Sequence, residues 1–472
     1  MKQNCNSFRS LIFLSSVVFT TGLFSVSTQV QTQNLYDTKY TTNTNTNKVF
    51  MQQINGLNDI EQDSFMLGRS FFTIPWVEAP SATTARDGLG PLFSANTCIN
   101  CHPRNGVGTL YNKNNSISRN LIVRLSIPSN GSEEHMHKEK YSGFVQEPTY
   151  GSQISINGVR GVPYEAKPKI KYENITITYP DKEQVILKKP LQGVENQLTD
   201  LQYGDMNKNV SVSHRLAPAL IGLGLLEQIT DEQILLNEDR DDKDGDGISG
   251  KANRVFSNKH QDFRVGRYTW KASAASVVDQ SAAAASNDMS LTNPYYPNEN
   301  CTSNQKECLE APKGDAVHGK YTFDLPLHRL EAIAFYLNNL KIPRSTITEK
   351  EGEKLFADIG CVKCHIPSFT LTNGYEIKPF SDILLHDMGE GLSDGRTEFE
   401  ATANEWRTAP LWGLGKYRLA LGKEPELLHD GRAKTVEEAI LWHGGEAQKV
   451  TRNFMNLSKK QRDSIIRYIG EL

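Results

Sequence analysis

Apolar residues recur at helical spacing in corresponding places of the two halves of the chain. A Gly-x-x-apolar-Phe step stands at 68–72 and again at 352–356, and each predicts the first helix of a unit. Each half then closes on an amphipathic pattern that ends Tyr-apolar-x-x-Leu, at 336–340 and 468–472. These matches predict one helical unit that occurs twice, with insertions between its parts.

A second shared signature lies inside each half. It reads Arg-x-Ala-Pro and then Leu-x-Gly-Leu-Gly at 215–224, and it returns with one residue fewer at 407–415. We therefore expect two domains, 65–343 and 344–472, that are joined near Pro343.

The first half is longer because it carries insertions. One of them contains two runs rich in β-branched residues, at 120–127 and 174–189, and such runs are typical of strands. We expect this part to form a small β-rich insertion in a protein that is otherwise mainly α.

Another insertion, which reads Asp-Asp-Lys-Asp-Gly-Asp-Gly, has the alternating acids of a calcium-binding loop. Asp242, Asp244 and Asp246 alternate, and the glycine after them permits the sharp turn that such a loop makes. The twelfth position is Asn253, where a calcium loop carries a bidentate Glu. The pattern therefore fits either a calcium site or a solvated acidic turn.

The N-terminus has the layout of a secretory signal peptide. Two basic residues precede an apolar run at 11–23 and small residues at 25–28, so we expect removal of residues 1–28 and export to the periplasm. A retained membrane anchor is the alternative, and only then do we expect contact with a membrane. A flexible linker is expected at 29–64.

Charge and cysteine usage narrow the class of protein further. The 472 residues carry a formal net charge of −3 and no basic block, so we expect no nucleic-acid partner. Of the seven cysteines, Cys5 lies in the predicted signal peptide. Cys301 and Cys308 suit an oxidising compartment, as a disulfide if the chain doubles back between them, or otherwise as two buried thiols.

The other four cysteines belong to two Cys-x-x-Cys-His motifs, which are typical of c-type haem. In such motifs two thiols add to the porphyrin, and the histidine beside the second thiol ligates the iron. A zinc ribbon would need the two distant motifs to meet, and it does not require the histidines. We therefore expect two cytochrome c-like domains, each with one covalently bound haem c. The residues expected to hold the haems are Cys98, Cys101, His102, Cys361, Cys364 and His365.

His443 ends a short amphipathic stretch near the C-terminus. Thr435 and Glu438 have the spacing of a capping box, which predicts a helix that begins just after Thr435 and turns His443 inward. An inward histidine taken alone is more often bonded to the backbone in the core. The matching stretch of the first half, which starts at Ser276, has Ala284 in the corresponding place.

This difference predicts two unlike irons. If each helix covers its own haem, His443 is the sixth ligand of the second iron, and the first iron has an open position beside Ala284. A saturated iron is suited to carrying electrons, whereas an open iron can bind and split a small oxidant.

Several longer phrases of the sequence resemble those of one family. They include DGLGPLFSANTCINCH, GRYTWKA, EWRTAPLWGLG and LLHDGRAKTVEEAILWHGGEA. From about Phe65 to Leu472 the chain resembles the di-haem oxidoreductases, a thiol oxidoreductase-like family of the bacterial diheme cytochrome c peroxidase superfamily. That superfamily also contains diheme enzymes that oxidise side chains of another protein.

The resemblance implies roles for three residues near the first haem. In the superfamily, a W-D-G-R-A…E-E-Q…E-M stretch supplies an inter-haem tryptophan, then a glutamine and an acid above the peroxide-binding haem. Here this implies Trp270, Gln280 and Asp288. The sequence departs from that pattern in having Lys271 after the tryptophan and an Asp that lies one residue closer to the glutamine. The superfamily has Met or Tyr where this chain has His443.

The function expected is that of a periplasmic oxidoreductase that reduces peroxide at the first haem. Electrons would enter at the second haem from a small redox protein or a quinol-linked donor, and Asp288 would move a proton between the peroxide oxygens. An electron-transfer relay with two six-coordinate irons and an oxidase that modifies a partner protein remain alternatives. His429 is expected to bond a haem propionate or the backbone, while His214, His386 and Met388 have no assigned role.

Overall fold

The computed structural model describes residues 37–83, 85–314 and 321–472. The predicted signal peptide, with Cys5, lies outside these residues. Among the residues that are described, no helix is both long enough and apolar enough to cross a membrane. Two large clusters of buried apolar side chains form most of the core, one dominated by the first half of the chain and one by the C-terminal helices.

The expectation of a mainly α protein is wrong. The structure is only 31% helical and 18% strand, and each sheet in the described part of the chain has two strands. The elements also do not show the pattern of two cytochrome c-like domains. The repeated signals mark a few helices, but the long segments between them are rich in glycine, proline and other turn formers, which favour short strands and loops.

Each half nevertheless contains one closely packed pair of helices. The pairs are α2 (Asp59–Thr73) with α11 (Leu327–Asn338), and α12 (Lys350–Asp358) with α16 (Lys459–Ile469). Glycine permits both approaches, because an added Cβ at Gly68 would lie 1.8 Å from the oxygen of Ala332. At Gly352 it would lie 2.1 Å from the oxygen of Ser464. The repeat is therefore present in the structure as a helix pair.

Apart from α8, with 13 residues, and α4, with 10, the other helices have nine residues or fewer, and the strands in the following pairs have four or fewer. The helices are α3 (Cys98–Cys101), α4 (Glu133–Ser142), α5 (Val194–Gln197), α6 (Leu223–Glu227), α7 (Asp231–Leu235), α8 (Val277–Met289), α9 (Lys306–Glu310), α13 (Tyr417–Leu421), α14 (Val436–Leu441) and α15 (Gln448–Asn456). The strand pairs are β2 (Val77–Glu78) with β3 (Asp87–Leu89), β4 (Leu92–Phe93) with β6 (Asn157–Gly158), β7 (Lys167–Pro168) with β10 (Leu198–Thr199), β12 (Arg254–Ser257) with β13 (Asp262–Val265), β15 (Phe369–Thr370) with β16 (Glu376–Ile377), and β17 (Leu385–Asp387) with β18 (Glu405–Arg407).

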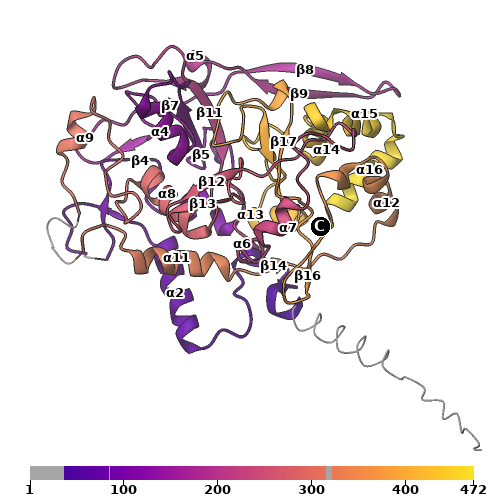
Figure 1. The fold of residues 1–472 in the computed structure, drawn as a ribbon, viewed down its shortest axis with the longest axis horizontal. Coiled ribbons are helices and arrows are strands. Elements are labelled where there is room, and N and C mark those ends of the chain that lie inside the picture. The colour runs from indigo at the N-terminus through magenta and orange to yellow at the C-terminus, as the bar shows by residue number, and fades with distance from the viewer. Residues whose placement is uncertain (1–36, 84, 315–320) are drawn as a thin grey trace, which may run out of the picture.

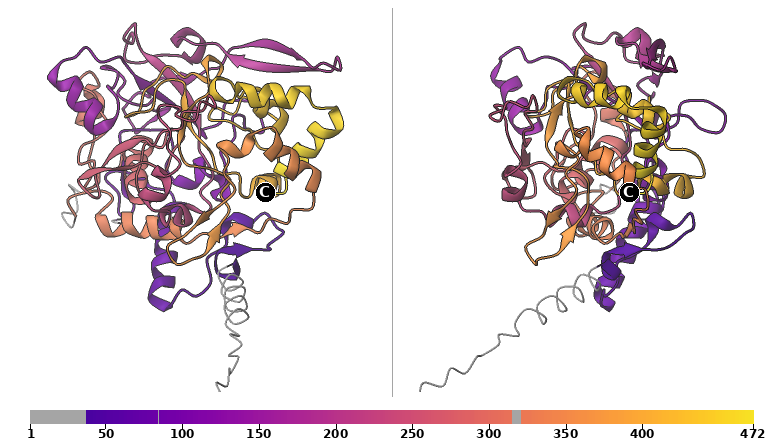
Figure 2. Two further views of the ribbon diagram at one scale, coloured as in Figure 1. Left: turned by 45° about the vertical axis from the view of Figure 1, so that its right-hand side comes forward. Right: turned by 90° about the vertical axis from the view of Figure 1, so that its right-hand side faces the viewer.

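The two runs rich in β-branched residues form strands. The run at 120–127 contains β5 (Leu121–Ser126), which pairs with β11 (Ser211–Leu216). The run at 174–189 forms most of a long antiparallel hairpin of β8 (Tyr172–Thr178) and β9 (Gln184–Pro190). This hairpin lies across the top of the molecule and reaches toward α14 and α15 (Figure 1). The C-terminal helices gather beneath its far end, as the turned views also show (Figure 2).

The described part of the stretch expected to be a linker packs on the rest of the protein. In it, β1 (Thr41–Thr42) pairs in parallel with β14 (Ile342–Pro343). Val49 and Phe50 are fully buried in the larger apolar cluster. Cys301 and Cys308 form a disulfide with their Cα atoms 5.8 Å apart, which was the first of the two expected alternatives.

Candidate active site

One cavity of about 1090 Å³ joins the two Cys-x-x-Cys-His motifs. Its walls are formed by parts of both halves of the chain, including α8 and the residues just after α14. The volume is larger than the roughly 300–1,000 Å³ of an ordinary small-molecule pocket. A single space of this size, with both motifs in its lining, suits large cofactors placed near one another.

The first motif presents His102 in the orientation of a metal ligand. Its Nδ1 lies 2.8 Å from the backbone oxygen of Pro218. Because a carbonyl oxygen can only accept, Nδ1 carries the proton and Nε2 keeps its free electron pair. Burial lowers the pKa of His102 to about 4, so the ring is neutral, as metal ligation requires.

The second motif repeats this arrangement with a different backbone partner. His365 Nδ1 lies 2.8 Å from the oxygen of Phe380, so its Nε2 is also the free nitrogen. Burial lowers the pKa of His365 to about 4, and the nearby ring of His443 contributes in the same direction. His365 and His443 therefore lie close together in the same cavity.

His443 is bonded to the backbone and faces the cavity at the same time. The helix α14 begins at Val436 as predicted, and Thr435 caps it by accepting a hydrogen bond from Glu438 N. His443 Nδ1 lies 2.7 Å from the oxygen of Ala439, which again leaves Nε2 free. The backbone bond of the first interpretation is thus present, and it leaves Nε2 available for the ligation that the second interpretation predicts. Ligation of an iron by His443 stays a prediction.

The helix α8 forms the corresponding wall near the first motif. Ser276 caps it through Asp279 N, and Gln280, Ala284 and Asp288 all contribute to the lining of the cavity. The helix continues as far as Met289, so Gln280 and Asp288 can both face one side of it, about two turns apart. At Ala284 it offers only a methyl group.

Asp288 is an enclosed carboxyl group beside the first motif. Asp288 lines the cavity together with Cys98 and Cys101. Burial raises the pKa values of both thiols, and the negative charge of Asp288 adds to that rise. Burial raises the pKa of Asp288, while Arg124 and a hydrogen bond from Gln153 Nε2 at 2.8 Å oppose that rise.

Sequence patterns gave no sign of Gln153 and Arg124, which the fold brings to this acid. The two residues form a bridge between adjacent extended segments, so their side chains point to the same side. Arg124 also lines the cavity, and within the described residues its guanidinium makes no hydrogen bond or ion pair. The apolar alternation of β5 could have shown which side Arg124 faces, but not which helix lies opposite.

Trp270 contributes to the wall of the cavity that the two motifs share. Its indole N–H donates to the oxygen of Leu216 at 2.7 Å, and Leu216 N donates to the oxygen of His429 at 2.7 Å. The tryptophan of the first half is thus linked through one residue to its counterpart in the second half. The ring of His429 stacks on the ring of Trp406 with centroids 3.7 Å apart. The hydrogen bond from Leu216 is accepted by the backbone oxygen of His429, so among the described residues its imidazole has no backbone partner.

Lys271, the departure from the superfamily pattern, is fully buried beside this stack. Its ammonium donates to the oxygens of Thr402 and Glu405 and lies 4.1 Å from the ring of Trp406. It therefore holds the loop between β17 and β18 against the first half of the chain.

A cluster of buried charges lies along the same wall. Arg215 and Arg396 bind the carboxylate of Glu398, while Arg215 and Lys271 pair with Asp394. Burial opposes ionisation of Glu398, but the arginines outweigh it and lower its pKa to about 2. Together with Arg124 this wall has more cations than carboxylates. A surplus of buried positive charge suits the carboxylate side chains of haem.

The residues present therefore fit two haems. Each motif supplies two thiols and one neutral histidine with its Nε2 free, and the shared cavity has room and counter-charge for the rings.

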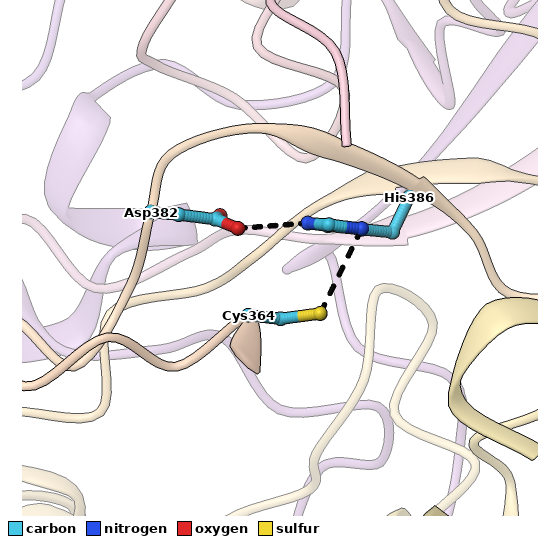
Figure 3. A group of neighbouring side chains, drawn as sticks. All are labelled: Cys364, Asp382 and His386. Carbon is cyan, nitrogen blue, oxygen red and sulfur yellow. Dashed lines mark hydrogen bonds and ion pairs between the residues drawn. The ribbon is translucent and has the colours of Figure 1, made fainter. Parts of the chain in front are cut away.

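The remaining histidines are not placed as iron ligands. Figure 3 shows His386 between Asp382 and Cys364, and its second nitrogen lies 2.7 Å from Glu446 Oε2. Burial lowers the pKa of His386, but the two carboxylates outweigh it and hold both nitrogens protonated. His214 is buried, with Nε2 at 3.2 Å from a backbone oxygen, as a core histidine would be. Met388 lines the cavity without an assigned role.

In the acid-rich loop, the three aspartates predicted as calcium ligands do not all belong to one cluster. Asp242 and Asp244 join Asp239, with carboxylate oxygens within 4.8 Å of one another, whereas Asp246 pairs with Lys363 of the second motif. Calcium binding by this loop stays a prediction.

Comparisons with known proteins agree with the two motifs. A family model described as "Di-haem oxidoreductase, putative peroxidase" matches residues 32–472. No curated protein matches the chain. Among solved structures, the chain is similar to "Kuenenia stuttgartiensis Hydrazine Synthase Pressurized with 20 bar Xenon", with 19% identity over 36% of this chain and 63% of that chain. The chain thus spans less than two thirds of that protein, and at a TM-score of 0.23 the likeness carries no argument.

Proposed function

Since the chain belongs to the di-haem oxidoreductase family, we propose that it is a peroxidase-like enzyme with one open and one six-coordinate haem. The observation that carries this proposal is the contrast between Ala284 and His443. Both line the same cavity, but only His443 offers a free imidazole nitrogen. With haem bound, His365 and His443 would both be available to the second iron, whereas Ala284 would leave the first iron free to take up a small molecule.

We propose that the haems are attached through thioether bonds. Cys98 and Cys101 would hold the first haem, and Cys361 and Cys364 would hold the second. The histidine of each motif, His102 or His365, would ligate the iron of the haem bound by that motif. The thiols are close to their histidines in sequence, and both histidines have the tautomer that ligation needs. A Cys98→Ala or a Cys361→Ala variant should each retain one covalent haem by mass spectrometry.

When bound, each haem supplies an iron that can exchange single electrons and, where a coordination position is vacant, can take up a small ligand. The surrounding side chains do the rest of the chemistry. Gln280 can hold a peroxide by hydrogen bonds from its amide. Asp288 would accept the proton of one peroxide oxygen and return it to the other oxygen, which would leave as water when the O–O bond breaks.

The environment of Asp288 suits a group that both accepts and returns a proton. Burial raises the pKa of Asp288 above that of an ordinary carboxyl group, which favours proton uptake. The charge of Arg124 and the hydrogen bond from Gln153 act in the opposite direction and favour the carboxylate. The hydrogen bond from Gln153 also fixes the direction in which the carboxylate points.

We propose that Trp270 is the aromatic bridge between the two haems. It lies in the wall shared by both motifs, and hydrogen bonds join it to the second half of the chain. Electrons would reach the second haem from a small redox protein or a quinol-linked donor in the periplasm.

Reaction with hydrogen peroxide tests the proposed enzyme directly. The fully reduced protein, with both haems present, should be reoxidised by one equivalent of hydrogen peroxide, since two single-electron sites supply the two electrons that peroxide needs. A protein that transfers electrons readily between partners but does not react with peroxide would be an electron-transfer relay.

A further inference from the structure

The β8–β9 hairpin reaches from the first half of the chain onto the helix that leads to His443. The hairpin lies across the top of the molecule with its far end over the C-terminal helices (Figure 1). Tyr179, just beyond β8, is only 1% exposed, and its hydroxyl donates to Glu437 Oε1 of α14 at 2.8 Å. The hairpin therefore touches the first turn of the helix that precedes His443.

The tip of the hairpin is bound to α16 by charge. Arg462 donates to Asp181 Oδ2 at 2.9 Å and to Glu183 Oε2 at 2.7 Å, and its guanidinium lies 3.8 Å from the ring centroid of Tyr179. Lys459 adds an ion pair of 2.8 Å with Glu183. Because Arg462 is buried, its contacts are less screened by solvent than those of a surface pair.

One face of the hairpin is apolar and closes over the C-terminal core. Leu187 is buried, and alternate residues on the two strands pack against the same apolar cluster as α14. These residues are Ile175, Ile177 and Val185. The opposite face is exposed, so burial fixes which side of the hairpin faces the protein.

The helix α14 needs such support because it is short. It has six residues, and helices of this length are not stable in water without packing. At its C-terminal end, Thr451 donates a hydrogen bond to the oxygen of His443 at 2.6 Å. At its N-terminal end, the partner that comes from another part of the chain is the hairpin, through Tyr179.

We propose that the β8–β9 hairpin is a clamp that keeps α14, and with it His443, in the position for ligation of the second iron. The inference rests on the proposed function, because it assumes that His443 is an iron ligand. It adds that a segment of the first half of the chain determines how readily the second iron loses that ligand. Tyr179, Asp181 and Glu183 are then positioning residues for His443.

Cyanide binding to the ferric protein with both haems bound can test the clamp. Cyanide needs a vacant coordination position, so it should bind quickly at the first iron and slowly at the second. At high cyanide concentration the slow phase should become independent of concentration, because departure of His443 limits it. The plateau of the slow phase therefore measures how firmly His443 is held, and the fast phase is an internal control.

Two variants weaken the clamp without touching the cavity. Tyr179→Phe removes the hydroxyl bond but keeps the ring, and Asp181→Asn with Glu183→Gln removes the charge at the tip. Tyr179→Phe should raise the plateau about fivefold, the effect of one lost hydrogen bond. The double variant should raise it at least as much, because it weakens the contacts of both Arg462 and Lys459. Both should leave the fast phase unchanged. The matched control is Glu173→Gln, which removes an exposed ion pair with Lys189 within the hairpin and should not change the plateau.

His443→Ala separates failure of the clamp from failure of the proposed ligation. If this variant loses the slow phase while both clamp variants keep the wild-type plateau, the hairpin does not hold His443 and the inference is wrong. If His443→Ala keeps the slow phase, His443 is not the ligand, and the proposed ligation fails together with the clamp.

Discussion

Ala284 lies the same number of residues beyond its helix N-cap, Ser276, as His443 lies beyond Thr435, and both residues line one cavity. Two helices with matching starts thus present a methyl group at one site and an imidazole at the other. The helices differ in length, since α8 continues to Met289 whereas α14 ends at Leu441. The wall beside Ala284 therefore also carries Asp288, for which α14 has no counterpart.

Removal of the imidazole should change one iron only. His443→Ala should convert the second haem from low spin to high spin, because that iron loses its second strong nitrogen ligand, and should leave the first haem as it is. Electron paramagnetic resonance of the ferric protein measures both irons separately. His214→Gln is the matched control, since His214 is also buried and bonded to a backbone oxygen but should not affect either spectrum. A wild-type spectrum in His443→Ala would mean that this residue is only a core histidine.

Loss of the carboxylate above the open site should slow the reaction with peroxide. Asp288→Asn keeps the shape of the side chain but removes proton transfer, a step that contributes a factor of about 10² to 10⁴. Haem content and spin state should stay those of the wild type. Stopped-flow mixing with hydrogen peroxide measures the rate. Equal rates in variant and wild type would exclude the acid–base role of Asp288.

The pH dependence of the same reaction should respond to Arg124. Asp288 must be ionised to accept a proton, so the rate should fall as the pH drops through its pKa. Burial raises that pKa and Arg124 lowers it, so Arg124→Gln should raise it and shift the acid limb of the pH profile to higher pH. Arg124→Lys, which keeps the charge, should shift the limb less. If the acid limb of the pH profile of Arg124→Gln is the same as in the wild type, Arg124 does not affect the pKa of Asp288.

The buried charge cluster should make stability depend on pH in the acid range. The arginines overcome the effect of burial and depress the pKa of Glu398 from 4.5 to about 2. Its stabilising contribution is therefore present above pH 4.5 and is lost as the pH falls toward 2. Glu398→Gln should lower the free energy of unfolding at pH 7 by about 3 kcal/mol, and the loss should shrink at pH 3. Chemical denaturation at both pH values measures this.

An exposed carboxylate provides the control for that prediction. Glu134 pairs with Lys138 on the surface of α4, and Glu134→Gln should leave the free energy of unfolding unchanged at both pH values. A loss in Glu398→Gln that is equal at pH 7 and pH 3 would contradict the assigned pKa, because protonation would then make no difference.

The sequence predicted the motifs, the repeated helix starts and the disulfide because these depend on local spacing. A Cys-x-x-Cys-His step or a capping residue specifies its own geometry within one or two turns. The predicted fold class, mainly α, was wrong because the repeated sequence signals are concentrated in a few helices. The segments between them are longer, and their glycines, prolines and short β-branched runs produce two-stranded sheets.

The site residues that the sequence did not reveal contact partners that are far away in the sequence. Gln153 meets Asp288, Tyr179 meets Glu437, and neither pair has a spacing that a local pattern could show. Lys271 illustrates the same limit, since its contacts with the backbone around Thr402 depend on how the two halves meet. Periodicity predicts which face of a helix or strand a residue occupies. Only the fold determines which side chain from another element contacts that residue.

The proposed function requires one iron that is open and one that is closed by His443. Electron paramagnetic resonance of the ferric wild-type protein, with the signals integrated against its haem content, counts both kinds of iron. We expect one high-spin and one low-spin haem per chain, with the high-spin haem converted to low spin when cyanide binds. Two low-spin haems per chain, with neither of them binding cyanide, would exclude an open iron.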